Sequence, residues 1–298
     1  MTHAVAGLIP ILATPFHSDG SLDTESLARL VDFSLWCGVD GVATFGMASE
    51  GFALTADERT RMLEVFTARV PSGMPIVAGI GATSTITAVE QALLSRDAGA
   101  TALMVLPPFM VKASPAQLVD FYGTVASTSG LPVMVQDAPA VTGVSMPVPT
   151  LVELSKLDGV TSAKVEAQPT APKVAALVDA VDDFAVLGGQ NALFALEEYG
   201  RGAVGTMPAC EFADVFAAVL SARAEGRDAD ARERFARLLP LIRFGMQGPI
   251  AWAVHKHVLV HRGVISDPAV RAPAAPLDAA SERDLRLILD DLRLPSFP

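Results

Sequence analysis

The feature that most limits the fold of this chain is a regular alternation of apolar runs and helical patterns. Between residues 7 and 207 there are eight short apolar runs, and a helix-like periodicity follows each of them. The runs are GLIPILATP (7–15), GVATF (41–45), PIVAGI (75–80), ALMVLP (102–107), PVMVQD (132–137), VTSAKV (160–165), FAVLGG (184–189) and AVGTM (203–207). Near-continuous apolar strands that alternate with helices indicate a parallel sheet covered on its outer face. Eight such units predict an α/β fold that closes into a TIM (β/α)8 barrel.

A doubly wound parallel sheet is the alternative fold. It would need a glycine-rich phosphate-binding turn after an early strand, followed about 20 positions later by an acidic residue at a strand end. The segment GIGATS (79–84) matches that turn only in part, and the acidic residue is missing. The barrel is therefore the favoured fold.

The pattern becomes purely helical in the last quarter of the chain. The helices expected there cover 227–247, 249–261 and 280–292. A proline-rich segment, 266–276, separates the last two. We expect a barrel domain over 1–226 and a helical C-terminal extension over 227–298 that packs on the barrel.

Charge and cysteine usage exclude several classes of protein. The formal net charge of −11 and the lack of a Lys/Arg block argue against a nucleic-acid partner. Cys37 and Cys210 have no CxxC spacing, so neither a disulfide framework nor a zinc site is expected. No basic region precedes the first apolar stretch, and no apolar run approaches the roughly 18 residues of a membrane span. We expect a soluble cytoplasmic protein without a membrane partner.

Active sites of such barrels lie at the C-terminal ends of the strands, which makes Lys164 the leading candidate. A lysine that points into the barrel mouth loses hydration, which disfavours the ammonium and favours an amine that can attack a carbonyl. Residues i and i+2 of a strand face the same way, so Glu166 shares that face. A structural ion pair between the two side chains is the alternative.

Other strand ends provide further candidates. They are Ala48, Ser49 and Glu50 after the second run, Gln136 in the fifth, Gly189 in the seventh and Thr206 in the eighth. No histidine lies at a strand end. His257 and His261 have the i, i+4 spacing of metal ligands, but no acidic residue joins them, so we expect a solvated helix face and no metal site.

Several of these segments resemble one known family. ILATPFHSDGSLD (11–23), a Gly-x-x-x-Glu turn (46–50), VLPPF (105–109), QDAP (136–139) and a lysine on the sixth strand are similar to the dihydrodipicolinate synthase/N-acetylneuraminate lyase family. The resemblance covers nearly the whole chain. It implies a TIM barrel, a homotetramer, and a Schiff base between Lys164 and a small-molecule 2-keto acid, without a metal or an organic cofactor.

The chain departs from this family at its proton-relay positions. Where the synthase has two threonines and two tyrosines, this sequence has Met47, Ala48, Gln136 and Phe109. Val141 replaces the arginine that receives the second substrate's carboxylate. These departures weaken a role in lysine biosynthesis, and the lost strand-five tyrosine also weakens a sialic acid lyase function.

The remaining features are closer to the L-2-keto-3-deoxyarabonate dehydratase-like branch. ASEGFAL (48–54), VMVQDAP (133–139) and the Lys-x-Glu pattern at Lys164 and Glu166 are similar to it. This similarity implies dehydration of a 2-keto-3-deoxy sugar acid. A class I aldolase, a synthase-like condensation of pyruvate and a non-catalytic 2-keto acid binder remain alternatives. A binder has no use for a carboxylate beside the imine.

The branch assignment suggests a role for each candidate. Without the tyrosine, Glu166 is the expected acid and base. Glu50 is the reserve, unless it braces its turn. The N–H groups of Ala48 and Ser49 and the Ser49 hydroxyl would receive the substrate carboxylate. We expect Gln136 to orient a hydroxyl or a water, although it could instead be bonded to backbone, and expect Gly189 and Thr206 to line the pocket or to allow close packing.

Overall fold

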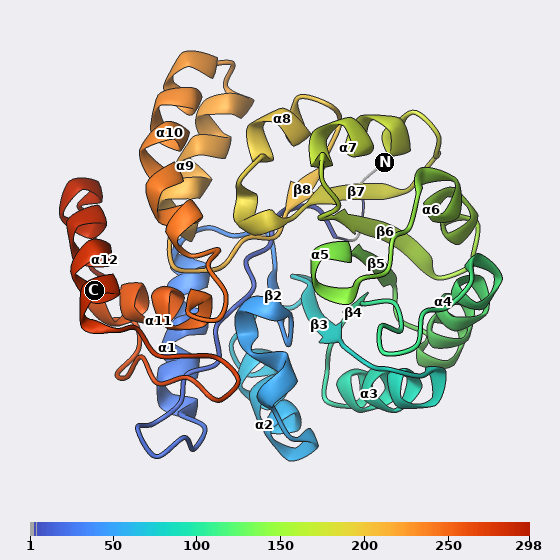
Figure 1. Cartoon of the computed structure of the whole chain (residues 1–298), viewed down its shortest axis with the longest axis horizontal. Coiled ribbons are helices and arrows are strands. Elements are labelled where there is room, and N and C mark those ends of the chain that lie inside the picture. Colours follow the sequence, from blue (N-terminus) through green and yellow to red (C-terminus); the bar gives the residue numbers. More distant parts are fainter. Residues whose placement is uncertain (1–2, 4) are drawn as a thin grey trace.

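Eight parallel strands form a single sheet in this computed structural model, which describes residues 3 and 5–298 (Figure 1). The strands are β1 Gly7–Leu8, β2 Val42–Thr44, β3 Ile76–Ile80, β4 Ala102–Val105, β5 Val133–Asp137, β6 Val160–Val165, β7 Ala185–Gly188 and β8 Gly205–Thr206. Each lies within one of the eight apolar runs, and their order in the sheet is β1-β8-β7-β6-β5-β4-β3-β2. The predicted TIM barrel is confirmed.

The barrel closes through the residues that follow β1. Ile11 forms parallel bridges both with Ala43 of β2 and with Ala209 after β8. The N–H of Ala43 donates to the carbonyl of Pro10 at 2.9 Å. The regular strand β1 covers only two residues of the predicted run 7–15, because Pro10 lacks the N–H that a continuous ladder needs.

Helices cover the outside of the strand ring. They are α1 Thr24–Trp36, α2 Ala56–Thr67, α3 Thr85–Asp97, α4 Pro115–Ser129, α5 Pro139–Thr142, α6 Val148–Ser155, α7 Thr170–Val178, α8 Ala195–Tyr199 and α9 Ala213–Ala224, with short 3₁₀ turns η1 Met47–Ser49, η2 Gly51–Ala53 and η3 Gln190–Ala192. A capping box starts α2, where the Thr55 side chain accepts from the N–H of Glu58 and Glu58 accepts from the N–H of Thr55.

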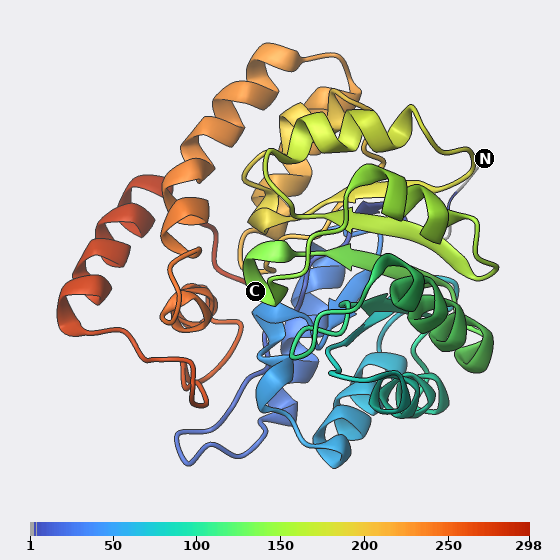
Figure 2. The same cartoon turned by 45° about the vertical axis from the view of Figure 1, so that its right-hand side comes forward.

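Three further helices lie to one side of the barrel (Figure 2). They are α10 Asp228–Phe244, α11 Ala251–His261 and α12 Ala279–Leu292. Arg262, after α11, attaches this layer to α9 by a bidentate ion pair with Asp214 at 2.7 and 2.8 Å. None of the helices described over residues 3 and 5–298 is long and apolar enough to cross a membrane.

The barrel interior is apolar below the strand ends. Ile9, Ile11, Val77, Met104 and Met134 belong to one buried cluster, separate from the larger cluster that includes the residues between strands and helices. Along β5 and β6 the interior face continues from this apolar cluster into polar side chains, because alternate residues share a face. The polar residues at the strand ends therefore rest on a dry, packed base.

Candidate active site

Lys164 lies near the end of β6 with only 3% of its surface exposed. Its neighbours in the sheet are Gln136 on β5 and Leu187 on β7. Ala163 and Val165 belong to the larger core cluster, so the Lys164 side chain points to the inside of the barrel. A buried ammonium requires a partner, and the structure provides one nearby.

The Glu166 carboxylate forms one ion pair and accepts two hydrogen bonds. Its Oε1 lies 3.4 Å from the Nζ of Lys164, which confirms that the two side chains share a face. The Nε2 of Gln136 donates to its Oε2 at 2.8 Å, and the N–H of Gln190 donates to Oε1 at 3.3 Å. The carboxylate is thus held beside the amine by groups from three neighbouring strand ends.

Gly189 leaves the space that this carboxylate occupies. A Cβ at Gly189 would lie 2.3 Å from the Cγ of Glu166, closer than any two such atoms can approach. A glycine directly after β7 is therefore needed for Glu166 to lie where it does.

Asp137 lies on the opposite face of β5 and does not join this group. Its Oδ2 pairs with the Nζ of Lys173 of α7 at 2.6 Å, and the same ammonium donates to the carbonyl of Met146. Burial raises the pKa of Asp137, and the bond from Lys173 opposes that rise. This residue is structural, because it lies on the side of the strand that faces α7.

Lys164 and Glu166 line a cavity of about 420 Å³ at the barrel mouth. On the barrel side it is lined by Ile11, Met47, Ala48, Ala140, Val141, Gln190, Asn191, Met207, Pro208 and Ala209. Gly245, Met246, Gly248, Ala251, Trp252 and His255 line it from the C-terminal layer. Trp252 donates its indole N–H to the carbonyl of Met47, which holds α11 against the turn after β2. The C-terminal layer is therefore part of the site.

Gln136 lines a smaller adjoining cavity of about 240 Å³, which shares Met47 and Val141 with the first. Arg59 also lines it, but its guanidinium donates to the carbonyls of Gly51 and Gly79 and lies 4.7 Å from the ring centre of Phe45. Burial lowers the pKa of Arg59 to about 10. This cation braces the turn.

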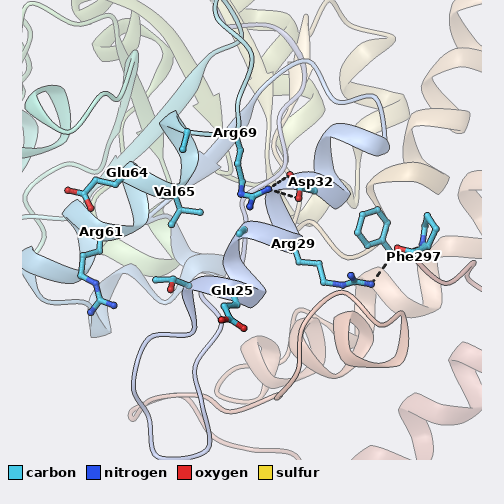
Figure 3. Close-up of a pocket in the computed structure, with 12 residues that line it drawn as sticks. Glu25, Arg29, Asp32, Arg61, Glu64, Val65, Arg69 and Phe297 are labelled. Carbon is cyan, nitrogen blue, oxygen red and sulfur yellow. Dashed lines mark hydrogen bonds and ion pairs between the residues drawn. The ribbon is translucent and has the colours of Figure 1, made fainter.

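A third hollow, of about 830 Å³, lies between α1, α2 and the last residues of the chain (Figure 3). Half of its charged side chains already have partners within the protein. Arg69 pairs with Asp32 at 2.6 Å, and Arg29 donates to the carbonyl of Gly263 and packs on the ring of Phe297. Size alone does not identify the site, because this larger hollow has no buried nucleophile.

Known proteins are similar to this chain over nearly its whole length. A family model described as the Dihydrodipicolinate synthetase family matches residues 4–292. The chain belongs to this family. It is 31% identical over 290 residues to the L-2-keto-3-deoxyarabonate dehydratase of Azospirillum brasilense, covering 95% of this chain and 93% of that protein.

Solved structures of dihydrodipicolinate synthetase family members have the same fold. A dihydrodipicolinate synthase from Rhodopseudomonas palustris superimposes with a TM-score of 0.91 at 29% identity and covers 98% of this chain and 99% of that one. A family member from an E. coli K12 prophage, solved in complex with pyruvate, superimposes with a TM-score of 0.88 at 27% identity over 97% and 99% of the two chains.

Besides Gln136, which lines only the adjoining cavity, four of the predicted site residues do not line the cavity beside Lys164. Ser49 is fully buried, and its hydroxyl donates to the carbonyl of Leu12, while its N–H donates to the carbonyl of Gly46. This corrects the expected carboxylate contact, because both Ser49 donors are already used. Gly189 and Thr206 are buried and packed, and neither is among the residues that line the cavity.

The fourth is Glu50, the reserve acid and base. Its carboxylate is fully buried and pairs with Lys256 of α11 at 2.5 Å, while its other oxygen accepts from the N–H of Arg271 at 2.9 Å. Burial lowers the pKa of Lys256 to about 8. Glu50 does brace its turn, but against the C-terminal layer, which corrects its expected catalytic alternative.

Sequence reasoning missed His255, which lines the cavity and pairs with a buried Glu211 at 2.7 Å. It also missed Trp252 and Asn191. A histidine and a lysine inside the apolar helix AWAVHKHVLVH were the available signal, because polar groups on a buried face need partners. Within the part of the chain that the structure describes, no three His, Cys, Asp or Glu side chains are grouped to hold a metal.

Proposed function

We propose that the chain is a lyase that forms a Schiff base between Lys164 and a 2-keto acid and dehydrates a 2-keto-3-deoxy sugar acid. The observation that carries this proposal is the buried Lys164 amine 3.4 Å from the Glu166 carboxylate on the wall of the cavity at the barrel mouth. The full-length similarity to a protein named L-2-keto-3-deoxyarabonate dehydratase supports the reaction, and the family member solved with pyruvate supports the keto acid.

The first step is attack of the neutral Lys164 amine on the C2 carbonyl. The C2 oxygen leaves as water after it takes one proton from the attacking nitrogen and one from Glu166, which received it from the Lys164 ammonium, and a protonated imine remains. Glu166 is the acidic group beside the amine that can accept and return these protons. The apolar base of the barrel excludes water from below, which strengthens the interaction between the two groups.

The protonated imine then makes the C3 hydrogens acidic. Glu166 removes one of them to give an enamine, and the enamine expels the C4 hydroxyl, which takes the proton from Glu166 and leaves as water. Hydrolysis of the resulting unsaturated imine frees the product and restores Lys164. One water is lost in total, since the water released on imine formation is consumed at the end. A positioned acid or base contributes about 10²–10⁴-fold to each transfer.

Two further residues have proposed roles. Gln136 uses its Nε2 to hold Glu166, so its carbonyl oxygen is the group that would accept from a substrate hydroxyl or a water. The Ala48 N–H at the cavity wall is the proposed contact for the substrate carboxylate. Neither contact requires a proton transfer, which fits an amide side chain and a backbone N–H, because neither of them titrates.

A class I aldolase or a synthase-like condensation would use the same lysine. The similar proteins include both a dehydratase and a synthase, so this second function is a candidate too. The two reactions differ in the bond that breaks, so they are separated by the mass of the trapped intermediate.

The deciding experiment is borohydride reduction followed by intact mass measurement, with pyruvate and separately with a 2-keto-3-deoxypentonate. We expect an adduct with both compounds, located on Lys164 by peptide mapping and absent in Lys164→Ala. With the pentonate, loss of water supports dehydration, and a pyruvate-sized adduct supports aldol cleavage. No adduct with either compound would refute the Schiff base.

Replacement of the acid and base separates imine formation from the later steps. Glu166→Gln should still form the trapped adduct, although more slowly, because Lys164 is unchanged, and should slow turnover by about 10²–10⁴-fold. Glu153→Gln, at an exposed carboxylate of α6, is the matched control and should turn over normally. Turnover of Glu166→Gln at the wild-type rate would show that another group moves the protons.

A further inference from the structure

One wall of the catalytic cavity is formed by a buried histidine and carboxylate pair that the proposed reaction does not use. His255 of α11 has 5% of its surface exposed and lines the cavity. Its Nδ1 lies 2.7 Å from Oε1 of Glu211, which is fully buried in the segment between β8 and α9. Within the described part of the chain, the second oxygen of Glu211 has no hydrogen-bond partner.

The pair fixes which nitrogen of His255 is available to a ligand. A carboxylate only accepts hydrogen bonds, so the Nδ1 of His255 carries the hydrogen that it donates to Glu211. In the neutral imidazole the Nε2 is then an acceptor, with no hydrogen bond to any residue in the described chain. This arrangement holds a hydrogen-bond acceptor at the cavity wall in one orientation.

Asn191 lies near the Cε1–Nδ1 edge of the same ring. A Cβ on Gly245 would lie 2.9 Å from Cε1 and 3.3 Å from Nδ1 of His255 and 3.6 Å from Nδ2 of Asn191. The Oδ1 of Asn191 accepts from the N–H of Ala209, and its Nδ2 is buried without a partner among residues 3 and 5–298, so it is closed to a ligand. The Nε2 of His255 is therefore the group that can bind, and a hydroxyl is a group that can donate to it.

The charges favour a hydroxyl over a second carboxylate at this wall. Lys164 is the only lysine or arginine among the residues that line the cavity, and it already pairs with Glu166. Behind His255 lies the negative charge of Glu211. A carboxylate placed there would be desolvated without a cation of its own, which is costly.

The pair also lies away from the reacting carbons. In Figure 1, α11 lies on the other side of β2 from β6. No hydrogen bond or ion pair joins His255 or Glu211 to Lys164 or Glu166 within the described residues. A substrate bound through C2 to Lys164 would therefore reach His255 with the part of its carbon chain beyond C4.

We propose that His255, positioned by Glu211, binds a hydroxyl on the carbon chain beyond C4 and selects sugar acids over short keto acids such as pyruvate. This inference rests on the proposed Schiff-base function and deepens it by assigning the distal end of the substrate. His255 is the binding residue, and Glu211 acts through it as a positioning residue.

The test compares two ligands in the same borohydride assay. For wild type and His255→Phe, we would measure the concentration of pyruvate and of a 2-keto-3-deoxypentonate that gives half-maximal adduct. Loss of the hydrogen bond should raise the pentonate value about tenfold and leave the pyruvate value unchanged. His261→Phe, at an exposed position of the same helix, is the control and should leave both values unchanged.

A second variant keeps the test decisive if His255→Phe does not fold. Glu211→Leu removes the acceptor of the Nδ1 hydrogen, so neither the tautomer nor the orientation of the His255 ring is fixed. This variant should raise the concentration of the pentonate that gives half-maximal adduct and leave that of pyruvate unchanged. A purely structural role would instead lower the amount of both adducts.

The outcomes separate the two proposals. If wild type traps neither ligand, the Schiff-base function fails. If it traps pyruvate and both variants keep the wild-type value for the pentonate, the distal site is refuted while the Schiff base stands. Failure of wild type to trap the pentonate while it traps pyruvate also refutes the distal site.

Discussion

At the scale of single residues, the position of Glu166 depends both on hydrogen bonds from its neighbours and on the absence of a side chain at Gly189. Gln136 and Gln190 direct its two oxygens, and Gly189 leaves the space for its side chain. Groups that take part in proton transfer must be held within a fraction of an ångström of the productive geometry. The carboxylate is therefore sensitive to changes in residues that never touch a substrate.

Gly189→Ala tests this dependence. The added methyl group would lie 2.3 Å from the Cγ of Glu166, so the carboxylate must leave its present position beside Lys164. We expect turnover to fall about 10²-fold while pyruvate is still trapped on Lys164, as measured by steady-state kinetics and borohydride adducts. Gly123→Ala, where the nearest atom is 3.9 Å away, should have no such effect.

A double variant tests whether Gly189 acts through Glu166. Gly189→Ala combined with Glu166→Gln should be no slower than Glu166→Gln alone, because both changes disable the same carboxylate. Additive losses would mean that Gly189 acts on turnover by a route that does not include Glu166.

The residues predicted well are those whose role follows from a single strand. The pairing of Lys164 and Glu166 follows from the two-residue repeat of β6. Ser49 and Glu50 could not be assigned, because their partners, Leu12 and Lys256, come from other elements. Spacing along the sequence indicates which residues are neighbours within an element, but it does not indicate contacts between elements.

At the scale of elements, the eight strands could be predicted because burial on both faces makes each one an apolar run. The four-residue helix α5 was missed, since one turn is too short to show a 3.6-residue period. The C-terminal helices were expected, but their periodicity cannot show which part of the barrel they cover. That is why the α11 residues of the cavity were not found.

The link between α2 and the segment after α11 should make stability depend on pH. Arg271 forms a bidentate pair with Glu58 at 2.6 and 2.8 Å, and this bond lowers the pKa of Glu58 from 4.5 to about 2. Between those two values the unfolded chain binds a proton that the folded chain does not. The stability from this pair is therefore complete above about pH 4.5 and is lost as the pH falls through about 2.

Urea unfolding of wild type and Glu58→Gln at pH 7 and pH 2.5 measures this effect. The variant should be less stable than wild type at pH 7, and the difference should shrink at pH 2.5. Asp57→Asn, at the exposed neighbouring carboxylate, is the control and should show a smaller difference at pH 7. An equal loss for Glu58→Gln at both pH values would exclude the ion pair as its cause.

At the scale of the whole molecule, we propose that the chain assembles as a homotetramer in the cytoplasm. Met110 and Val111, in the loop after β4, have 77% and 78% of their surfaces exposed, and such side chains favour burial against another chain. Cys37 and Cys210 are buried free thiols, which suits a reducing compartment.

Sedimentation equilibrium tests the assembly. We expect a mass about four times the 31.1 kDa of the chain, and a smaller species when Met110→Glu and Val111→Glu are combined. Ile86→Glu, at an apolar side chain of α3 that is also exposed, should leave the mass unchanged. A wild-type mass of 31.1 kDa would contradict the tetramer.

The buried pair between Glu50 and Lys256 has a consequence for biosynthesis. The turn after β2 leaves the ribosome long before α11 does, so in the nascent chain the Glu50 carboxylate has no Lys256 and the Met47 carbonyl has no Trp252. A catalytic pocket with its final shape can therefore form only after translation has passed α11. A chimera that takes residues 227–298 from a relative would need the matching β2 turn from the same parent.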